Sequence, residues 1–186
     1  MNSKERFLSV IRGEPCDKTP VFPLLMAFSA RRYGATYGEF ASNGSIFAES
    51  QIKIYEMFKV DAITSCTDAF RVSAYLGGEM VFPKDEPPHL ARPLVTTVND
   101  LIRLKKPDVA DPTGRMADRI RGTEQMIKAV GKEYMVLRWV DMPFAEACSL
   151  CGVAEFLLML YDTAGLAHKI KVCLIYSVQD VKSPQK

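Results

Sequence analysis

The chain has 186 residues, of which 48% are hydrophobic and 25% charged, and its formal net charge is +2 at pH 7. This is the composition of a globular protein, and the length indicates a single domain over residues 1–186 with a core of its own. Acidic and basic residues are interspersed, which argues against the basic surface of a nucleic-acid-binding or membrane-surface protein. We therefore expect no nucleic acid and no membrane among its partners.

The sequence lacks the features of an export signal or a membrane span. Residues 1–6 are polar and include an acidic residue, unlike a signal peptide. The longest apolar run, residues 153–161, is interrupted by Glu155 and is far below the roughly 20 residues of a spanning helix. Five cysteines without an export signal are typical of reduced thiols. Together these features predict a cytoplasmic protein.

The first two elements are predicted to be a helix and a strand. Asn2 or Ser3 caps a helix over residues 3–12, in which apolar residues recur at helical spacing and which Gly13 ends. The run 20–25 is apolar and bracketed by proline, which predicts a strand buried on both faces of a parallel sheet.

The middle of the chain predicts a second helix over residues 45–58 and a second buried strand over residues 60–64. Enough residues lie between the two predicted strands for the crossover connection that a parallel pair requires. Residues 80–97 differ from this pattern. Two short strands there, at 80–83 and 93–96, flank a proline-rich turn and predict a hairpin-like insertion.

The last part of the chain predicts a helix, a strand and a final helix. Asp111 and Pro112 mark the start of a helix that runs to about Val130. Residues 134–137 predict a third buried strand. Asp162 is placed to cap a last helix that runs into the 170s.

Strands that alternate with helices in this order predict a parallel α/β architecture, either a doubly wound sheet or a barrel. No strand is followed by the glycine pattern of a dinucleotide-binding fold or of a phosphate-binding loop. A barrel is therefore the favoured architecture.

An ordered series of short segments then stands out along the chain. The segments are KERFL at 4–8, RGEP at 12–15, DKTPV at 17–21, residues 26–33, Thr67-Asp68, Leu76-Gly77, FPKDEPP at 82–88, residues 101–108 and PFAEA at 143–147. In this order and spacing the series resembles the uroporphyrinogen decarboxylase family. The resemblance covers residues 3–170 and is lost beyond Lys171.

The resemblance implies a (β/α)8 TIM-type barrel with its active site at the carboxyl ends of the strands. The chain would supply the N-terminal half of such a barrel, with the hairpin as an insertion, and would stop before the barrel closes. A half barrel leaves sheet edges unpaired. We therefore expect a homo-oligomer or a complementary barrel half as its partner, and doubt that the chain turns over substrate alone.

The family includes two chemistries. Decarboxylases remove acetate carboxyl groups from a tetrapyrrole without a cofactor, and their relatives transfer methyl groups between corrinoids, thiols or methylated substrates, often with zinc. The resemblance therefore implies a small-molecule tetrapyrrole or corrinoid as the ligand. Corrinoid and zinc are the cofactors expected of a full-length methyltransferase relative, and neither is assigned to this chain.

Asp68 is the candidate catalytic residue. It follows the second predicted strand and matches the aspartate that binds the pyrrole N–H groups of the substrate in the decarboxylases. One buried carboxylate that accepts several N–H bonds is favourable, because charge-assisted hydrogen bonds are strong. The alternative is a structural role, since aspartate is a preferred helix cap.

Arg31, Arg32 and Tyr33 are the candidate substrate-binding residues. The decarboxylases hold the substrate carboxylates with two arginines about four residues apart. Arg31 or Arg32 matches the second of these, before Tyr33, but Ala27 or Phe28 occupies the place of the first. This departure counts against strict decarboxylase activity, and the alternative for both arginines is a solvated loop.

No metal site is predicted. Cys148 and Cys151 form a C-x-x-C without the second pair of ligands that a zinc site needs, so packing is the simpler account. His89 and His168 have no partner histidine nearby in the sequence. The zinc ligands of the methyltransferases would fall in the half of the barrel that the chain lacks.

Four further charged residues accompany these candidates. Asp141 and Glu146 flank the loop after the third strand and are candidates for the same barrel mouth, although their spacing does not define an acid/base pair. Arg71 and Arg138 are candidates for additional positive charge there.

These features favour methyl transfer between a corrinoid and a thiol or methylated small molecule. The alternatives are cofactor-free decarboxylation of uroporphyrinogen and an inactive fragment that binds a partner chain.

Overall fold

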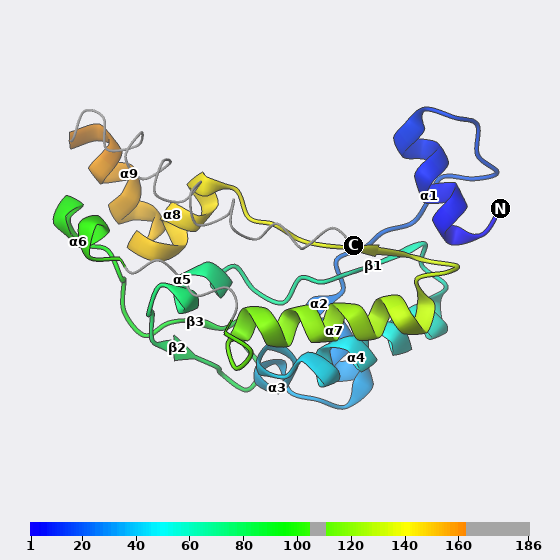
Figure 1. Ribbon diagram of the computed structural model, residues 1–186, viewed down its shortest axis with the longest axis horizontal. Helices are drawn as coiled ribbons and strands as arrows, with labels where there is room; N and C mark the ends of the chain where they lie inside the picture. The colour runs from blue at the N-terminus through cyan, green and yellow to red at the C-terminus, as the bar shows by residue number, and fades with distance from the viewer. Residues whose placement is uncertain (105–110, 163–186) are drawn as a thin grey trace. The chain divides into compact units, whose positions relative to one another are not determined.

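The computed structural model describes residues 1–104 and 111–162 (Figure 1). These residues form two compact units, each of which is described by itself. The first comprises Met1–Thr67, Phe82–Pro87 and Asp118–Trp139. The second comprises Asp68–Val81, Pro88–Ala117 and the described residues from Val140 onward. Two such units can belong to one domain, so a single domain over residues 1–186 stays a prediction.

The first unit is a mixed α/β structure. Its elements are α1 (Ser3–Arg12), α2 (Met26–Tyr33), α3 (Tyr37–Ser42), α4 (Gly44–Phe58), β1 (Ala62–Thr64), most of α7 (Arg115–Val130) and β4 (Met135–Leu137). β1 and β4 pair in parallel, with Ala62 opposite Met135 and Thr64 opposite Leu137. Parallel strands connected through helices confirm the predicted α/β class.

Local sequence signals explain the ends of the first helix. The Asn2 side chain accepts a hydrogen bond from the Glu5 N–H, and the Glu5 carboxylate accepts one from the Asn2 N–H, which is a reciprocal capping box. Gly13 ends α1 in the left-handed conformation, with φ of 70°, which costs glycine no steric strain. The predicted helix over residues 3–12 is therefore confirmed.

The core of the first unit forms where α4 meets α3 and α7. Phe40 and Phe47 are fully buried, and their rings pack edge to face with centroids 5.4 Å apart. Gly44 on α4 and Gly122 on α7 allow the two backbones to approach. A Cβ atom added to Gly122 would lie 2.5 Å from the carbonyl oxygen of Gly44.

The second unit consists mostly of short helices. Its elements are α5 (Arg71–Tyr75), β2 (Met80–Val81), β3 (His89–Leu90), α6 (Val98–Arg103), α8 (Pro143–Cys151) and α9 (Val153–Asp162), and α7 begins within it. β2 and β3 form an antiparallel pair, which is the predicted hairpin. The core gathers around Ala147, Leu150 and Phe156, which bring α8 and α9 together.

The predicted strand over residues 20–25 is wrong. These residues form no strand, because Pro20 and Pro23 have no N–H group to donate to a ladder. Only Val21 pairs. Its carbonyl oxygen accepts a hydrogen bond from the Asp61 N–H, and its own N–H donates to the Asp61 carboxylate at 2.7 Å.

The second strand of the hairpin was predicted at 93–96 but lies at His89–Leu90. The N–H groups of Leu94 and Val95 donate instead to the carbonyl oxygen of Leu150, which ties this segment to the end of α8. The segment therefore cannot complete a strand ladder.

The helix predicted to start at Pro112 begins three residues later, at Arg115. The Asp111 carboxylate accepts a hydrogen bond from the Thr113 N–H at 2.8 Å and so fixes a turn before α7. The last predicted helix, after Asp162, lies outside the described residues.

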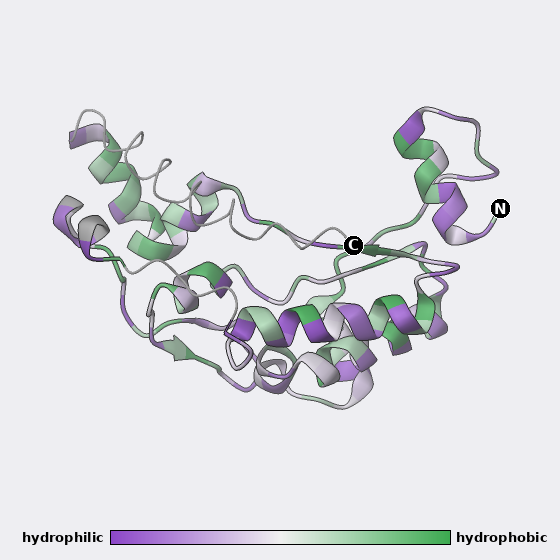
Figure 2. Cartoon of the chain, viewed as in Figure 1, coloured by the Kyte–Doolittle hydropathy of each residue, from purple (hydrophilic) through white to green (hydrophobic). Residues whose placement is uncertain are grey.

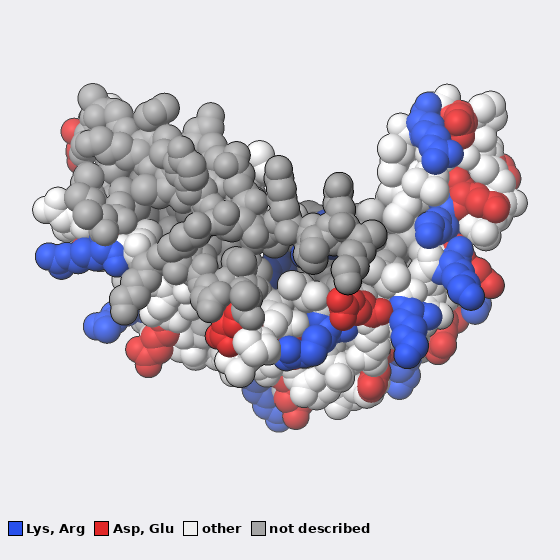
Figure 3. Space-filling model, viewed as in Figure 1, with Lys and Arg blue, Asp and Glu red and all other residues white. Residues whose placement is uncertain are grey.

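The surface of the described residues mixes charge and apolar side chains. Lysine and arginine alternate with acidic residues on the face in Figure 3, and Figure 2 shows hydrophobic residues along much of α8 and α9. Within the described ranges, no single helix has the length and apolar composition to cross a membrane. The pair α8 and α9 meets that test only jointly, with a bend of 106° between the helices.

Candidate functional site

Asp68 lies in the second unit, immediately before α5, with a side chain that is 1% exposed. Its Oδ1 atom accepts a hydrogen bond from the Phe70 N–H at 3.0 Å, so the carboxylate shapes the turn into α5. Arg115 Nη2 lies 2.7 Å from Oδ2 and Nη1 lies 3.3 Å from Oδ1. Asp68 therefore shapes the turn before α5 and takes part in a two-point ion pair, but it does not cap the helix, whose N-cap is Phe70 without a side-chain hydrogen bond.

Arg115 was not singled out by the sequence, where it is one of several charged residues in a predicted helix. It is the first residue of α7, and the turn at Asp111 sets where that helix starts. Its side chain is 19% exposed, so the ion pair with Asp68 is largely shielded from water. Only the fold reveals this partner, because 47 residues separate the two in sequence.

A second ion pair joins α5 to the segment before α8. Arg71 Nη2 lies 3.3 Å from Asp141 Oδ2, and the two side chains are 8% and 13% exposed. Arg71 is the first residue of α5, three residues after Asp68. The expectation that Arg71 and Asp141 belong to the surroundings of Asp68 is consistent with this geometry, although their function stays a prediction.

Glu146 on α8 is the most unusual ionisable group of the second unit. It is 2% exposed, and its Oε2 atom has no hydrogen-bond partner. Burial, together with the negative charges of Asp141 and Asp68, raises the pKa of Glu146 to about 8, although the positive charge of Arg71 opposes this rise. The carboxyl group is therefore mainly protonated at neutral pH. Perturbed groups of this kind concentrate at functional sites.

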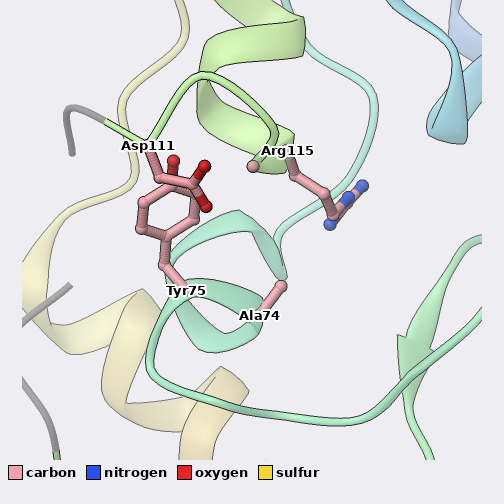
Figure 4. Close-up of a pocket in the computed structure, with 5 residues that line it drawn as sticks. Ala74, Tyr75, Asp111 and Arg115 are labelled. Carbon is pink, nitrogen blue, oxygen red and sulfur yellow. The ribbon is translucent and has the colours of Figure 1, made fainter. Parts of the chain in front are cut away.

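A small pocket of about 200 Å³ lies in the same unit, lined by Ala74, Tyr75, Asp111, Gly114 and Arg115. Figure 4 shows the Tyr75 side chain rising from α5 toward the turn that holds Asp111, while the Arg115 guanidinium is directed to the other side. A Cβ atom at Gly114 would collide with the Tyr75 ring. Glycine is thus required for the close approach of this turn to α5.

The family model described as uroporphyrinogen decarboxylase (URO-D) matches residues 2–178, which is nearly the whole chain. The chain belongs to the uroporphyrinogen decarboxylase family. The match also extends past Lys171, where the resemblance was expected to end.

Curated relatives carry the same name. The chain is 28% identical to a uroporphyrinogen decarboxylase from Chloroherpeton thalassium, with 68% of the chain and 37% of the relative covered. It is 24% identical to one from Hydrogenovibrio crunogenus, with 94% and 52% covered. The chain thus spans about half or less of the length of these relatives.

A solved structure shows the same fold. The methyltransferase from Methanosarcina mazei matches 97% of this chain with a TM-score of 0.78 and 20% sequence identity, and the match covers 57% of that protein. At this identity the likeness establishes the fold, which is an α/β fold shared with part of that enzyme. The full barrel is an inference from the family.

The predicted substrate-binding residues lie on α2 in the first unit. Arg31 and Arg32 are exposed, and the guanidinium group of Arg32 lies over the Phe28 ring, 5.5 Å from its centroid. The Tyr33 hydroxyl donates a hydrogen bond to Glu49, which together with burial raises the pKa of Tyr33. Asp68 belongs to the other unit, so the grouping of these residues in one site stays a prediction.

The residues considered for metal binding form no metal site in the described part of the chain, which has no cluster of three or more histidine, cysteine or acidic ligands. Cys148 and Cys151 lie on α8, and burial raises the pKa of both thiols, that of Cys151 to about 11. His89 begins β3, and His168 lies outside the described residues. Arg138 is exposed and belongs to the first unit, so its role near the candidate site stays a prediction.

Proposed function

We propose that this protein acts in the methyl-transfer branch of the uroporphyrinogen decarboxylase family, moving a methyl group between a corrinoid and a thiol or methylated small molecule. The observation that supports this most is the surface of α2. Ala27 or Phe28 stands at the place of the first substrate-binding arginine of the decarboxylases, and Phe28 packs on Phe58, with ring centroids 5.6 Å apart. Aromatic rings cannot replace a guanidinium group as a partner for carboxylates.

Arg31 or Arg32 matches the second arginine, and Arg32 lies over the Phe28 ring. The cationic clamp that an octacarboxylate substrate needs therefore lacks its first arginine. A corrinoid with neutral amide side chains makes a smaller demand on cationic groups. The methyltransferase name of the Methanosarcina mazei structure agrees with this branch.

Zinc and a corrinoid, the two cofactors of this branch, are considered separately. Zinc does not fit the described residues, which have no set of ligands for it, so no step is assigned to a metal. A corrinoid supplies the cobalt that accepts or donates the methyl group when it is bound. The groups of this chain available for positioning and proton transfer are Asp68 with Arg115, and the neutral carboxyl group of Glu146.

Decarboxylation of uroporphyrinogen is the second candidate, because the curated relatives bear that name. Loss of carbon dioxide leaves a carbanion that must be protonated, and Glu146 holds a proton at neutral pH. Asp68 is the residue that would accept pyrrole N–H bonds with its carboxylate oxygens.

Quenching of the single tryptophan distinguishes the two candidates. The backbone N–H of Trp139 donates to Ser65 Oγ at 3.2 Å, so this residue lies where β1 and β4 end, on the side of the sheet where the family binds its ligands. Titration with cyanocobalamin and, separately, with octacarboxylate uroporphyrin should quench Trp139 if the added macrocycle binds. Free N-acetyl-tryptophanamide corrects for absorption by the chromophores.

Saturable quenching by cyanocobalamin and none by uroporphyrin supports methyl transfer. The reverse result favours the decarboxylase, and should then be weakened by Asp68→Asn. If neither compound quenches, the proposed function is wrong for this chain. Arg121→Gln, a change at an exposed residue of α7, is the matched control.

A further inference from the structure

Helix α9 presents an apolar face to solvent (Figure 2). Its large exposed apolar side chains are between 50% and 91% exposed, and they are Val153, Leu157, Leu158 and Tyr161. Their spacing places them on one side of the helix, whereas Phe156 on the other side is buried in the cluster formed with α8. A helix that is apolar on both sides is ordinarily covered on both, so the exposed side of α9 is suited to contact another surface.

Acidic residues border this apolar side. Glu155 comes three residues before Leu158 and Asp162 comes four residues after it, so both lie next to Leu158 on the helix surface. Both are exposed to solvent. The sequence of α9 contains no lysine or arginine. The four apolar side chains and their two acidic neighbours together are called the α9 face, and its charge is negative.

Helix α2 in the first unit has the opposite combination. Phe28 is 41% exposed and packs on Phe58 of α4, which is 48% exposed, with ring centroids 5.6 Å apart. Arg31 and Arg32 follow Phe28 by three and four residues, so they lie on its side of α2, and both are exposed. Glu56 on α4 is only two residues from Phe58, and residues with that spacing do not share a side of a helix. The two rings and the two arginines are called the α2 patch, and its charge is positive.

We propose that the α9 face of one copy of this chain docks on the α2 patch of a second copy. The charges are complementary, because the acidic residues of α9 meet the two arginines while the apolar side chains cover the exposed aromatic rings. Two α9 faces would instead bring acidic residues together. A membrane surface is a poorer occupant, because helices that lie on anionic membranes have lysine and arginine beside their apolar side.

This contact gives a defined surface to the homo-oligomer that was predicted from the sequence. The two surfaces differ from each other, so a change at either one weakens the assembly. A dimer closes if both copies make the contact reciprocally, and otherwise copies add to a ring or a chain. The inference does not depend on the methyl-transfer proposal, and its test measures molecular mass and not ligand binding.

The test is sedimentation velocity of the full chain over a wide range of protein concentrations. Wild type should associate as the concentration rises. The paired change Glu155→Lys with Asp162→Lys, and the paired change Arg31→Glu with Arg32→Glu, should each weaken association at least about tenfold, because like charges then meet. An equimolar mixture of these two variants should associate as wild type does, because each surface again meets a surface of opposite charge.

Two further variants test the apolar part of the contact. Leu158→Ser should weaken association about tenfold, because less apolar surface is then buried. Ile127→Ser changes an apolar residue of α7 that is 52% exposed and belongs to neither surface, so it is the matched control and should associate as wild type does. Circular dichroism verifies that every variant is folded.

Three results would overturn the inference. The first is a wild-type chain that stays monomeric at every concentration, whatever other partner its α9 face then binds. The second is loss of association with the α9 changes but not with the α2 changes, which would mean that α9 docks on a different surface. The third is a mixture of the two charge-reversed variants that stays dissociated. None of these results affects the proposed function, which is tested by the quenching of Trp139.

Discussion

Arg115 and Asp68 form a two-point ion pair between the first turn of α7 and the segment before α5, with Nη2–Oδ2 and Nη1–Oδ1 distances of 2.7 and 3.3 Å. The Asp68 side chain is 1% exposed, so its charge depends on groups of the protein, among them this guanidinium group and the Phe70 N–H. A buried charge tolerates the loss of its partner poorly, because the remaining ion is neither hydrated nor paired.

Arg115→Gln should therefore lower the free energy of unfolding by about 3 kcal/mol, as expected when one partner of a buried pair is removed. Urea denaturation followed by circular dichroism measures the change. Arg121→Gln, which affects an exposed pair with Asp118 on the same helix, should have little effect. The double variant Arg115→Gln with Asp68→Asn should recover part of the loss, since no charge is then left unpaired. Equal effects of the Arg115 and Arg121 changes would contradict the buried pair.

Glu146 should make the protein less stable as the pH rises. Burial and the nearby aspartates raise its pKa from the ordinary 4.5 to about 8. Between these values the unfolded chain has lost this proton and the folded chain has kept it, so raising the pH favours unfolding. The stability linked to neutral Glu146 is complete below pH 4.5 and is lost as the pH approaches 8.

The measurement is the free energy of unfolding of wild type and Glu146→Gln at several pH values between 4.5 and 8. As the pH rises, the free energy of unfolding of wild type should fall relative to that of Glu146→Gln by up to about 1.4 kcal/mol per pH unit. Glu155→Gln controls for the loss of a carboxyl group from the surface. A constant difference between wild type and Glu146→Gln across this range would show that Glu146 is ionised in the folded state.

Elements defined by nearby residues were predictable. The Asn2 cap and Gly13 set both ends of α1, and the apolar residues of 45–58 identified α4. These signals act within a few residues, so the sequence contains all of the information. The strand predicted at 20–25 does not form. Its residues are as apolar as those of a buried strand, but its prolines have no backbone N–H to donate to a neighbouring strand.

The site was only partly predictable, because its contacts join distant segments. The positions after predicted strands identified four candidate residues: Asp68, Arg71, Asp141 and Glu146. Nothing local indicated that Arg115 pairs with Asp68, or that Glu146 is buried without a partner for Oε2. Glu146 lies on α8, which packs against α5 and α9, and the pattern of the sequence does not specify this packing.

The thiols of Cys148 and Cys151 should react slowly with iodoacetamide. Burial raises the pKa of both thiols. At Cys151 the neighbouring Cys148 and Glu155 also raise the pKa, which reaches about 11. Little of the reactive thiolate therefore exists at pH 8. Peptide mass spectrometry after a short native labelling should show Cys151 modified about tenfold more slowly than the more exposed Cys16. Labelling in urea should remove the difference. Rapid native labelling of Cys151 would mean that α8 is not packed as described.

Gly122→Ala should destabilise the protein, against the usual trend for helices. Alanine in place of glycine ordinarily stabilises a helix interior by up to about 1 kcal/mol. At Gly122 the new Cβ atom would lie 2.5 Å from the Gly44 carbonyl oxygen and 3.1 Å from the Phe47 ring, so α4 and α7 would have to separate. Overpacking of this kind costs about 1–3 kcal/mol. Glu124→Ala, at an exposed position two residues further along α7, should be nearly neutral in the same urea titration. Stabilisation by Gly122→Ala would show that the two helix backbones do not meet at this point.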